Sequence, residues 1–328
     1  MSYSPDKGSL VCSTCKYVEA LPKNKDTITE KRLGEDFDFS NLDKGLGGNF
    51  EGQLCGGCGA FIAISKHEEW ESCPFCGEEE AEALRGKINT IRPSAILPFN
   101  YPRAKAVSKF STWARGLFAP AALLQAARQA HVKPVYIPFW NFEVMTRSSW
   151  KAVQMVDAGK GKKSKQPVQG FFAHFFDDIR LFASEQIDPL AWESLGTYPL
   201  EKAVKFDPKY LEGMNTELIQ QDIKGVVRIA EKALEKRIRD QITQKAKRAV
   251  YQNMSVRSQK QLLDTKLMLL PVWVAIYGTG PDQERVLING FTGEMTAERP
   301  YSTIKVAIGV LVAVLGVIGF IILLNNLF

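Results

Sequence analysis

The stretch VAIGVLVAVLGVIGFIILL, residues 306–324, holds nineteen residues without a charged or polar side chain and without proline. A helix rises about 1.5 Å per residue, so this run covers about 28 Å, which matches the roughly 30 Å hydrocarbon core of a bilayer. The core helix of a soluble protein usually keeps a polar face, and this stretch has none. The pattern therefore predicts a transmembrane anchor over residues 304–326, with Val306 and Leu324 towards its two ends.

The charges around the span predict its orientation. Arg299 and Lys305 precede it and no charge follows it, so the positive-inside rule places the N-terminal body in the cytoplasm and the span in the inner (plasma) membrane. Four residues follow the span, which predicts a tail-anchored, single-pass protein, and MSYSPDKGSL has no apolar core of a signal peptide.

Gly309, Ala313 and Gly316 share one side of the span. Two such helices could approach closely there as a homo-oligomer, or these residues are simply common in membrane helices.

Length and composition predict about two domains in front of the span. The chain has 328 residues, 45% hydrophobic and 24% charged, with a formal net charge of +6. We predict an α+β protein with an N-terminal four-cysteine zinc ribbon, a mixed α/β body with antiparallel strands and one long helix, and a single C-terminal transmembrane helix. The boundaries are a partial ribbon remnant and linker at 1–50, the ribbon at 51–88 and the cytoplasmic body at 89–300.

Two pairs of cysteines have the spacing of a structural metal site. Cys55 and Cys58 form one C-x-x-C pair, Cys73 and Cys76 form another, and fourteen residues with a strand-like segment at 60–64 lie between them. Two facing pairs offer four thiolates in a tetrahedron, which suits Zn²⁺ and leaves no open position for catalysis. A redox dithiol would instead carry one pair at the start of a helix, and a reducing compartment leaves these thiols free for metal.

Cys12 and Cys15 form a third pair, and thirty-nine residues separate Cys15 from Cys55. A site with four thiolate ligands needs two more cysteines, so three interpretations stay open. The pair is a relic of a second ribbon that lacks its first half, it shares a metal ion with the same pair of another chain, or it joins the other four cysteines in an alternative ligand set. The polar, glycine-rich segment that follows it is typical of a loose linker.

The residues around the ribbon indicate the partner that it would contact. Glutamates outnumber bases there: Glu68, Glu69, Glu71, Glu78, Glu79, Glu80 and Glu82 face only Lys66. Nucleic-acid binding is driven by basic side chains, so an acidic ribbon disfavours DNA or RNA and favours a protein partner. His67 is predicted to be a surface residue, because four cysteines already complete the site.

Several patterns divide the body into elements. Prolines make residues 91–99 extended, and apolar spacing predicts helices at 101–117 and 119–130. Strands are predicted at 135–144 and 267–276, which share a motif of proline followed two residues later by tryptophan (Pro138 and Trp140, Pro271 and Trp273). Because proline removes a hydrogen-bond donor, both strands are expected to start or edge a sheet, and the repeat suggests two related β-units that pack together. A hairpin with a glycine-assisted turn is predicted at 284–293.

Three further stretches invite functional interpretations. Residues 159–169 are basic but lack the spacing of a phosphate loop, which predicts a solvated loop. Residues 214–252 predict one long helix, capped by Asn215 or Thr216, whose basic second half is a solvated face, a contact for anionic lipid or a weaker candidate for nucleic acid. His174 beside Asp177 and Asp178 resembles an acid–base group, but a packed histidine in a strand that ends in a turn is the favoured interpretation.

Taken in order, the stretches CGGCGA, CPFCG, ILPF, FSTWARGLFAP, VYIPFW, KFDPKYLEGM, LLPVW, INGFTGE and ERPYS resemble a bacterial family of membrane-attached zinc-ribbon proteins. Members often carry a more complete N-terminal ribbon, of which SYSPDKGSLVCSTC matches only the second half. Such proteins are often labelled replication-helicase-like because of the ribbon, but this chain has no Walker motif. Some relatives look like membrane partners of phage-shock protein A, and the resemblance implies that they help to recruit it during envelope stress.

The sequence thus predicts a non-enzymatic, membrane-tethered scaffold that binds zinc structurally and recruits cytosolic protein partners. The first alternative is a membrane-tethered nucleic-acid-binding protein that uses the basic helix and loop. The second is a hydrolase built on His174, Asp177 and Asp178.

Overall fold

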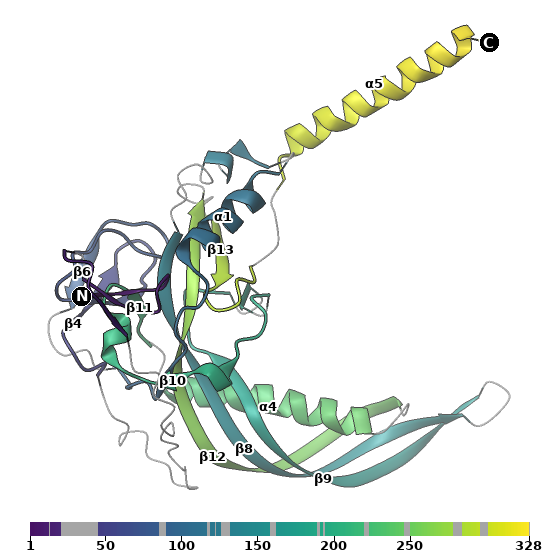
Figure 1. Cartoon of the computed structure of the whole chain (residues 1–328). Helices are drawn as coiled ribbons and strands as arrows, with labels where there is room; N and C mark the ends of the chain where they lie inside the picture. Colours follow the sequence, from purple (N-terminus) through teal and green to yellow (C-terminus); the bar gives the residue numbers. More distant parts are fainter. Residues whose placement is uncertain are drawn as a thin grey trace.

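Two long strands organise the body of the protein. β8 (Val132–Asp157) and β12 (Val250–Tyr277) pair antiparallel over most of their 26 and 28 residues, whereas strands usually have three to ten. Figure 1 shows both strands running from the body into a curved arm. The structure is a computed structural model that describes residues 1–12, 14–20, 45–84, 90–116, 119–121, 123–125, 132–157, 162–188, 191–192, 194–219, 223–245, 250–277, 284–295 and 301–327.

Ten strands of the described residues form one mixed sheet around this pair. The other eight strands are β4 (Phe50–Cys55), β5 (Phe61–Ser65), β6 (Ala81–Leu84), β7 (Ala95–Ile96), β9 (Lys163–Phe182), β10 (Val204–Lys205), β11 (Asn215–Glu217) and β13 (Glu284–Asn289). The main order is β10-β7-β12-β8-β11-β5-β4-β6, with β13 on β12 and β9 on β8. The sheet therefore crosses the predicted boundary at residue 88, because β5 of the ribbon pairs with β11 of the body.

The wide base of the sheet is buried on both faces. Successive side chains of a strand point to opposite sides, so adjacent residues pack into two different clusters. On one face, Tyr136 and Trp273 pack with α1 (Arg103–Ala114), which buries Phe110 and Trp113 as its predicted apolar side requires. On the other face, Val135 packs with the ribbon residues around the cysteines. The helix predicted for 101–117 is thus confirmed in its central part, whereas most of 119–130 lies outside the described residues.

The arm consists of β9, β8 and β12 and bends near Glu143. The pairing register shifts between Phe142 and Val144 on the β9 side and between Leu262 and Asp264 on the β12 side. Extra residues in both flanking strands therefore face Glu143, and such bulges bend a sheet and increase its twist. The prediction of a loop at 159–169 is wrong in its second half, because β9 begins at Lys163 and pairs with the end of β8. This part of β9 is exposed on both faces, so its polar sequence does not show the alternation that identifies a strand.

α4 (Ile223–Lys245) lies along the inner face of the arm (Figure 1). Leu234, Ile238 and Ile242 of this helix are buried against Phe172 and Phe176 of β9, together with Trp140, Phe142 and Leu267 of the neighbouring strands. The single helix predicted for 214–252 is therefore wrong at both ends. Asn215 and Thr216 do not cap it but pair with β5 and β8 in β11, and residue 250 already belongs to β12. Pairing in the sheet overrides the local helix preference.

The two prolines of the repeated motif lie inside paired strands, so their predicted place at the start or edge of a sheet is wrong. Pro138 is opposite Leu269, and Pro271 is opposite Tyr136. Each proline instead marks the end of a second neighbour: β9 pairs from Phe139 onwards, and β13 pairs from Val272 onwards. A residue without an N–H is tolerated there because no further strand needs the donor. The two motif-bearing strands pair with each other directly.

The predicted hairpin at 284–293 is confirmed in part: its first strand and its glycine-assisted turn are present, but residues 291–293 belong to the turn and not to a returning strand. β13 pairs with β12, the amide of Gly293 donates to the carbonyl of Asn289 (2.9 Å), and Ile288 bridges back to Met295. Gly293 has φ +81°, and a Cβ there would overlap the ring of Tyr101, so glycine is required.

The two ends of the chain form separate elements. β1 (Ser2–Ser4), β2 (Ser9–Val11) and β3 (Val18–Ala20) form a small antiparallel sheet that packs on the body through Tyr3 and Leu10. Most of the predicted linker lies outside the described residues. The short 3-10 helices η2 (Leu200–Lys202) and η3 (Pro208–Leu211) precede α4, and α5 (Thr303–Leu327) projects from the body as a single helix (Figure 1).

Candidate metal centre and the acidic pocket beside it

Two turns of the same shape bring four cysteines together. In the first, the amide of Cys55 donates to Ala60 (2.9 Å) and the amide of Gly59 donates to Cys55 (3.1 Å). The second repeats these bonds, with Cys73 donating to Glu78 (2.8 Å) and Gly77 donating to Cys73 (2.9 Å). Gly59 and Gly77 have φ of +71° and +76°, a conformation that favours glycine. The pattern C-x-x-C-G therefore builds each turn locally, as the spacing predicts.

The four sulfurs lie close enough to hold one metal ion. Cys55 Sγ and Cys76 Sγ are 3.5 Å apart, Cys58 Sγ and Cys73 Sγ are 3.7 Å apart, and all four atoms lie within 4.8 Å of one another. A tetrahedral ion with metal–sulfur bonds of about 2.3 Å would place its ligands about 3.8 Å apart. The four predicted ligands thus form one cluster whose dimensions fit such an ion.

The crowded thiols disturb one another's ionisation. The hydrogen bond with Cys73 lowers the pKa of Cys58 to about 5, and the same bond, together with burial, raises the pKa of Cys73. Cys58 therefore ionises before Cys73. Metal ligation requires thiolates, so a cation at the centre would displace the remaining protons.

The cluster forms part of the hydrophobic core. Cys55 and Cys73 are buried with Phe75 and Ile62 against Val135 of the central strand β8. The guanidinium of Arg285 on β13 lies over the ring of Phe75, 5.8 Å from its centre. The candidate metal site is therefore closed on the side of the sheet, and its buried cysteines pack against the body.

Cys12 and Cys15 form a third turn of the same shape. The amide of Cys12 donates to Tyr17 (2.9 Å), and the amide of Lys16 donates to Cys12 (3.1 Å). Lys16 has φ +60° at the position where the other two turns have glycine. The backbone amide of Cys15 lies 3.5 Å from Cys12 Sγ and is the main reason why the pKa of Cys12 falls to about 7. These two cysteines do not join the four-cysteine cluster, so the relic and the shared-metal interpretations both stay open.

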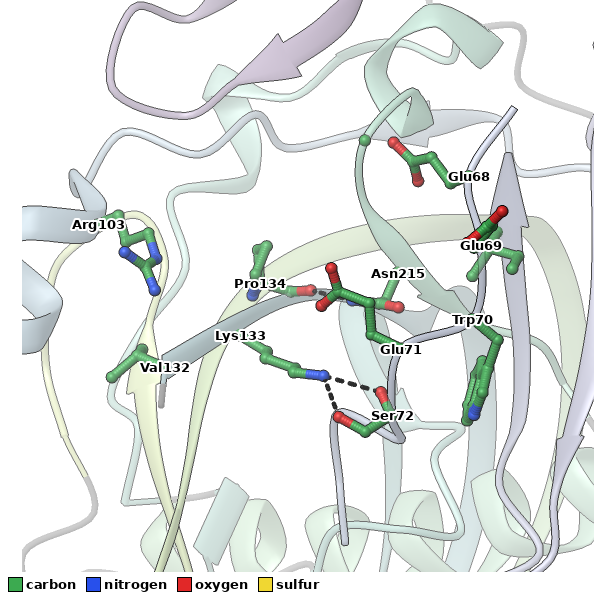
Figure 2. A pocket seen from close by; sticks show the side chains of 12 residues that line it. Glu68, Glu69, Trp70, Glu71, Ser72, Arg103, Val132, Lys133, Pro134 and Asn215 are labelled. Carbon is green, nitrogen blue, oxygen red and sulfur yellow. Dashed lines mark hydrogen bonds between the residues drawn. The ribbon is translucent and has the colours of Figure 1, made fainter. Parts of the chain in front are cut away.

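A pocket of about 600 Å³ opens beside the metal cluster (Figure 2). Its walls are the segment that follows β5, the start of β8, Arg103 at the start of α1 and Asn215 of β11. Figure 2 shows Lys133 Nζ donating to the carbonyl oxygen of Ser72 (2.9 Å) and to its hydroxyl (2.5 Å). Because Ser72 directly precedes the ligand Cys73, folding of the metal centre also positions this wall.

The pocket is acidic at its rim. Glu68, Glu69 and Glu71 line it, and Glu69 and Glu71 are exposed. Burial raises the pKa of Glu68, helped by the negative charges of Glu212 and Glu71. Burial lowers the pKa of Lys133, and the nearby Glu71 partly offsets that effect. The arrangement offers acceptors to a cationic side chain, with Trp70 beside them.

The predicted surface position of His67 is confirmed, because its side chain is exposed.

Glu217 is a buried acid that sequence reasoning missed. Its side chain is 4% exposed, and Ser184 Oγ donates to its Oε1 at 2.9 Å. Burial raises the pKa of Glu217 to about 8, although the bond from Ser184 acts in the opposite direction. In the sequence this residue stands in a segment predicted as helix, where nothing distinguishes it from a surface glutamate.

The residues of the hydrolase hypothesis lie on the arm, far along the sheet from the metal centre. His174 packs between the rings of Phe172 (5.6 Å) and Phe176 (4.6 Å), which agrees with the packed histidine favoured by the sequence. The predicted turn after it is wrong, because β9 continues through Asp177 to Phe182. The side chain of Asp178 lies outside the described residues.

α5 carries the predicted anchor residues Val306, Gly309, Ala313, Gly316 and Leu324. Its window Thr303–Phe320 has a mean hydropathy of 2.4, and none of it is buried against the rest of the protein. The helix is therefore long and apolar enough to span a membrane. Lys305 at its start is tied to the body, because its Nζ donates to the carbonyl of Ala119 (2.7 Å).

Together these features define an α+β protein with a four-cysteine cluster that can hold a metal ion and a C-terminal helix that can span a bilayer. No family model and no solved structure matches the chain. The chain is 26% identical over 244 residues to the "Uncharacterized protein YdjG" of Bacillus subtilis (strain 168). The aligned region covers 69% of this chain and 68% of that protein. The resemblance to membrane-attached zinc-ribbon proteins stays a prediction.

Proposed function

We propose that this protein is a non-enzymatic scaffold that holds cytosolic protein partners at the inner face of the plasma membrane, in the envelope stress response. The observation that carries the proposal is α5, an exposed helix whose residues 306–324 are all apolar, at the end of a polar body. Arg299 and Lys305 in front of the helix favour a cytoplasmic body by the positive-inside rule.

The metal centre supports a structural role. Four cysteine sulfurs in a closed arrangement suit Zn²⁺, which prefers thiolates and tetrahedral geometry and is available to cytosolic proteins. A zinc ion with four protein ligands has no position for water or substrate. Cys55, Cys58, Cys73 and Cys76 would then stabilise the ribbon and the acidic wall of the pocket that follows it in the chain.

The acidic pocket is the candidate docking site for a partner. Its rim of Glu68, Glu69 and Glu71 would accept an arginine or lysine side chain of the partner, and Trp70 offers an apolar surface beside it. Charged rims of this kind steer encounter and select partners of opposite charge. A basic segment of a cytosolic protein, such as a phage-shock protein A-like partner, fits this chemistry.

Affinity purification of the full-length chain from detergent-solubilised membranes, with identification of the bound proteins, tests the proposal. We expect a cytosolic protein to co-purify under envelope stress. The amount of this partner bound to the Glu68→Lys/Glu71→Lys variant should be at least tenfold lower.

The matched control reverses two exposed acids of the ribbon outside the pocket, Glu79→Lys/Glu80→Lys, and should retain the partner. Absence of a protein partner from the native chain under every stress condition would contradict the scaffold function. Equal loss in both double variants would remove the pocket as the docking site.

One observation favours the second candidate, a membrane-tethered nucleic-acid-binding protein. Lys162, Lys163 and Lys165 are exposed near the tip of the arm, where they could contact phosphates. A mobility shift of DNA or RNA by the solubilised full chain, weakening steeply with salt, would favour this function over the scaffold.

A further inference from the structure

One edge of β9 has no partner strand among the described residues. β9 pairs with β8 along its twenty residues, and no other described strand pairs with it. Figure 1 shows it as the outer strand of the arm. Exposed strand edges carry free N–H and C=O groups, and proteins usually protect them with charges, prolines or covering elements.

The middle of β9 lacks the charges and prolines that protect its two ends. Towards the tip of the arm the strand carries Lys163, Lys165 and Pro167, and towards the body it carries Asp177 and Arg180. Between these groups, residues 170–176 read GFFAHFF and contain no acidic, lysine, arginine or proline residue. Four of these seven residues are phenylalanine, which has a high strand preference, and the window stands on an open edge without the features that normally prevent pairing.

Two phenylalanines of this window point away from the core. Phe171 is 69% exposed and Phe175 is 41% exposed, and they lie on the outer face of the arm, opposite the face that α4 covers. Ala173 stands between them on the same face because side chains alternate along a strand. Large apolar side chains spaced along a free edge are typical of a surface that another chain covers.

We propose that two copies of this chain pair through the β9 edges, antiparallel and centred on Ala173, and so form one continuous sheet. This register places Phe171 of each copy opposite Phe175 of the other, which gives two aromatic cross-strand pairs on the outer face. Moving the centre by one residue, to 172 or 174, leaves both exposed rings opposite residues that are not aromatic. The register centred on Ala173 also sets Asp177 opposite Gln169 and Arg180 opposite Gln166, so no like charges face each other.

The inner face of this edge has room for the second copy. A groove of about 340 Å³ lies between β9 and α4, with His174 and Phe176 on one side and Asp240 and Gln244 on the other. Under the proposed twofold axis, Phe172 and His174 of the second strand would lie beside this groove. The added strand would thus lie next to existing open space and would not displace α4.

The position of α5 is compatible with this pairing. A twofold axis through Ala173, perpendicular to the sheet, keeps the same face of both arms on the same side. Figure 1 shows α5 leaving the body on the side of the arm where α4 lies, so both copies would direct α5 to one membrane. Tethering two chains in one bilayer raises their effective concentration and favours pairing.

Cysteine cross-linking in native membranes tests the register directly. Directly opposed residues of antiparallel strands have Cα atoms about 4.5–5.5 Å apart, within the range of a disulfide. We therefore expect the full-length Ala173→Cys variant, in a Cys12→Ser/Cys15→Ser background, to form a cross-linked dimer under mild oxidation.

The matched control is Gln169→Cys, an exposed residue of the same strand and face. In the proposed register its two copies lie about eight residues apart along paired strands, about 26 Å, so it should cross-link at least tenfold less. Equal cross-linking of both variants, or no cross-linking of either, would overturn the proposal.

A charge in the window provides a second test. Adding Phe171→Lys to the Ala173→Cys variant should abolish the cross-link, whereas Ser149→Lys, an exposed residue of the middle strand on the same face, should leave it. Light scattering of the solubilised native chain should give the mass of a dimer, and the mass of a monomer would contradict the pairing. None of these measurements depends on a cytosolic partner, so they separate the dimer from the scaffold function.

Discussion

The cysteines carry most of the chemistry that single residues contribute to this protein. Each of the four clustered sulfurs lies at an equivalent corner of the metal centre, so removal of one leaves three ligands and an open position. The turns around them form by local hydrogen bonds, but the cluster also requires the contact of Phe75 and Ile62 with the sheet. Metal binding and folding of the ribbon should therefore be coupled.

Cys73→Ser tests this coupling. We expect the metal content to fall from about one ion per chain to near zero, and the ribbon to become sensitive to protease, because a structural site supplies its own folding energy. Metal analysis of the purified chain measures the first effect.

Cys12→Ser is the control, and it should leave the metal content nearly unchanged. Loss of about half an ion per chain in this control would instead indicate a metal shared between two copies. A Cys73→Ser variant with its full metal content would contradict the assignment of the site.

The raised pKa of the buried Glu217 predicts that the free energy of unfolding depends on pH. Burial raises its pKa from 4.5 to about 8, so between these values the folded protein holds a proton that the unfolded chain releases. The stability that this protonated acid contributes is therefore present below about pH 4.5 and is lost as the pH rises through about 8.

Glu217→Gln removes this dependence, because glutamine stays neutral and still accepts the bond from Ser184. We expect thermal unfolding of the variant and the native chain to coincide near pH 4.5. At pH 9 the variant should be more stable, on the order of a few kcal/mol. Parallel stability curves across this range would show that Glu217 does not ionise on unfolding.

Secondary-structure elements show how far the sequence could be interpreted. The helix around Phe110 and Trp113, the turn at Gly293 and the two C-x-x-C-G turns were predictable, because each is specified by residues close in the sequence. The ends of α4 and the start of β9 were not, because the residues there are polar and become strands only by pairing with β8. The buried Glu217 and the wall formed by Lys133 likewise depend on residues distant in the sequence.

Ile238→Ala tests whether α4 is held by the arm alone. Ile238 is fully buried against the inner face, so its truncation should cost about 2–5 kcal/mol. We expect faster amide hydrogen exchange in α4 and in the facing strands, with unchanged metal content. Lys236→Ala, an exposed position of the same helix, should behave like the native chain. Unchanged exchange in the Ile238 variant would mean that α4 is held by other contacts.

At the scale of the whole molecule, the surfaces for which we propose functions lie on different parts of one sheet. The metal centre and the acidic pocket lie at the base, the open edge of β9 lies on the arm, and α5 leaves the opposite end of the body (Figure 1). A membrane anchor would hold the first two surfaces close to the bilayer, where soluble partners would be concentrated. Both functions proposed above, the scaffold and the membrane-tethered nucleic-acid-binding protein, therefore depend on α5.

Fractionation of cells that produce the full-length chain tests that claim most directly. The account predicts that the protein sediments with membranes, resists extraction by high salt and alkaline carbonate, and dissolves only in detergent, whereas a chain that ends at residue 302 stays in the soluble fraction. Full-length protein that stays in the soluble fraction without detergent would contradict the account.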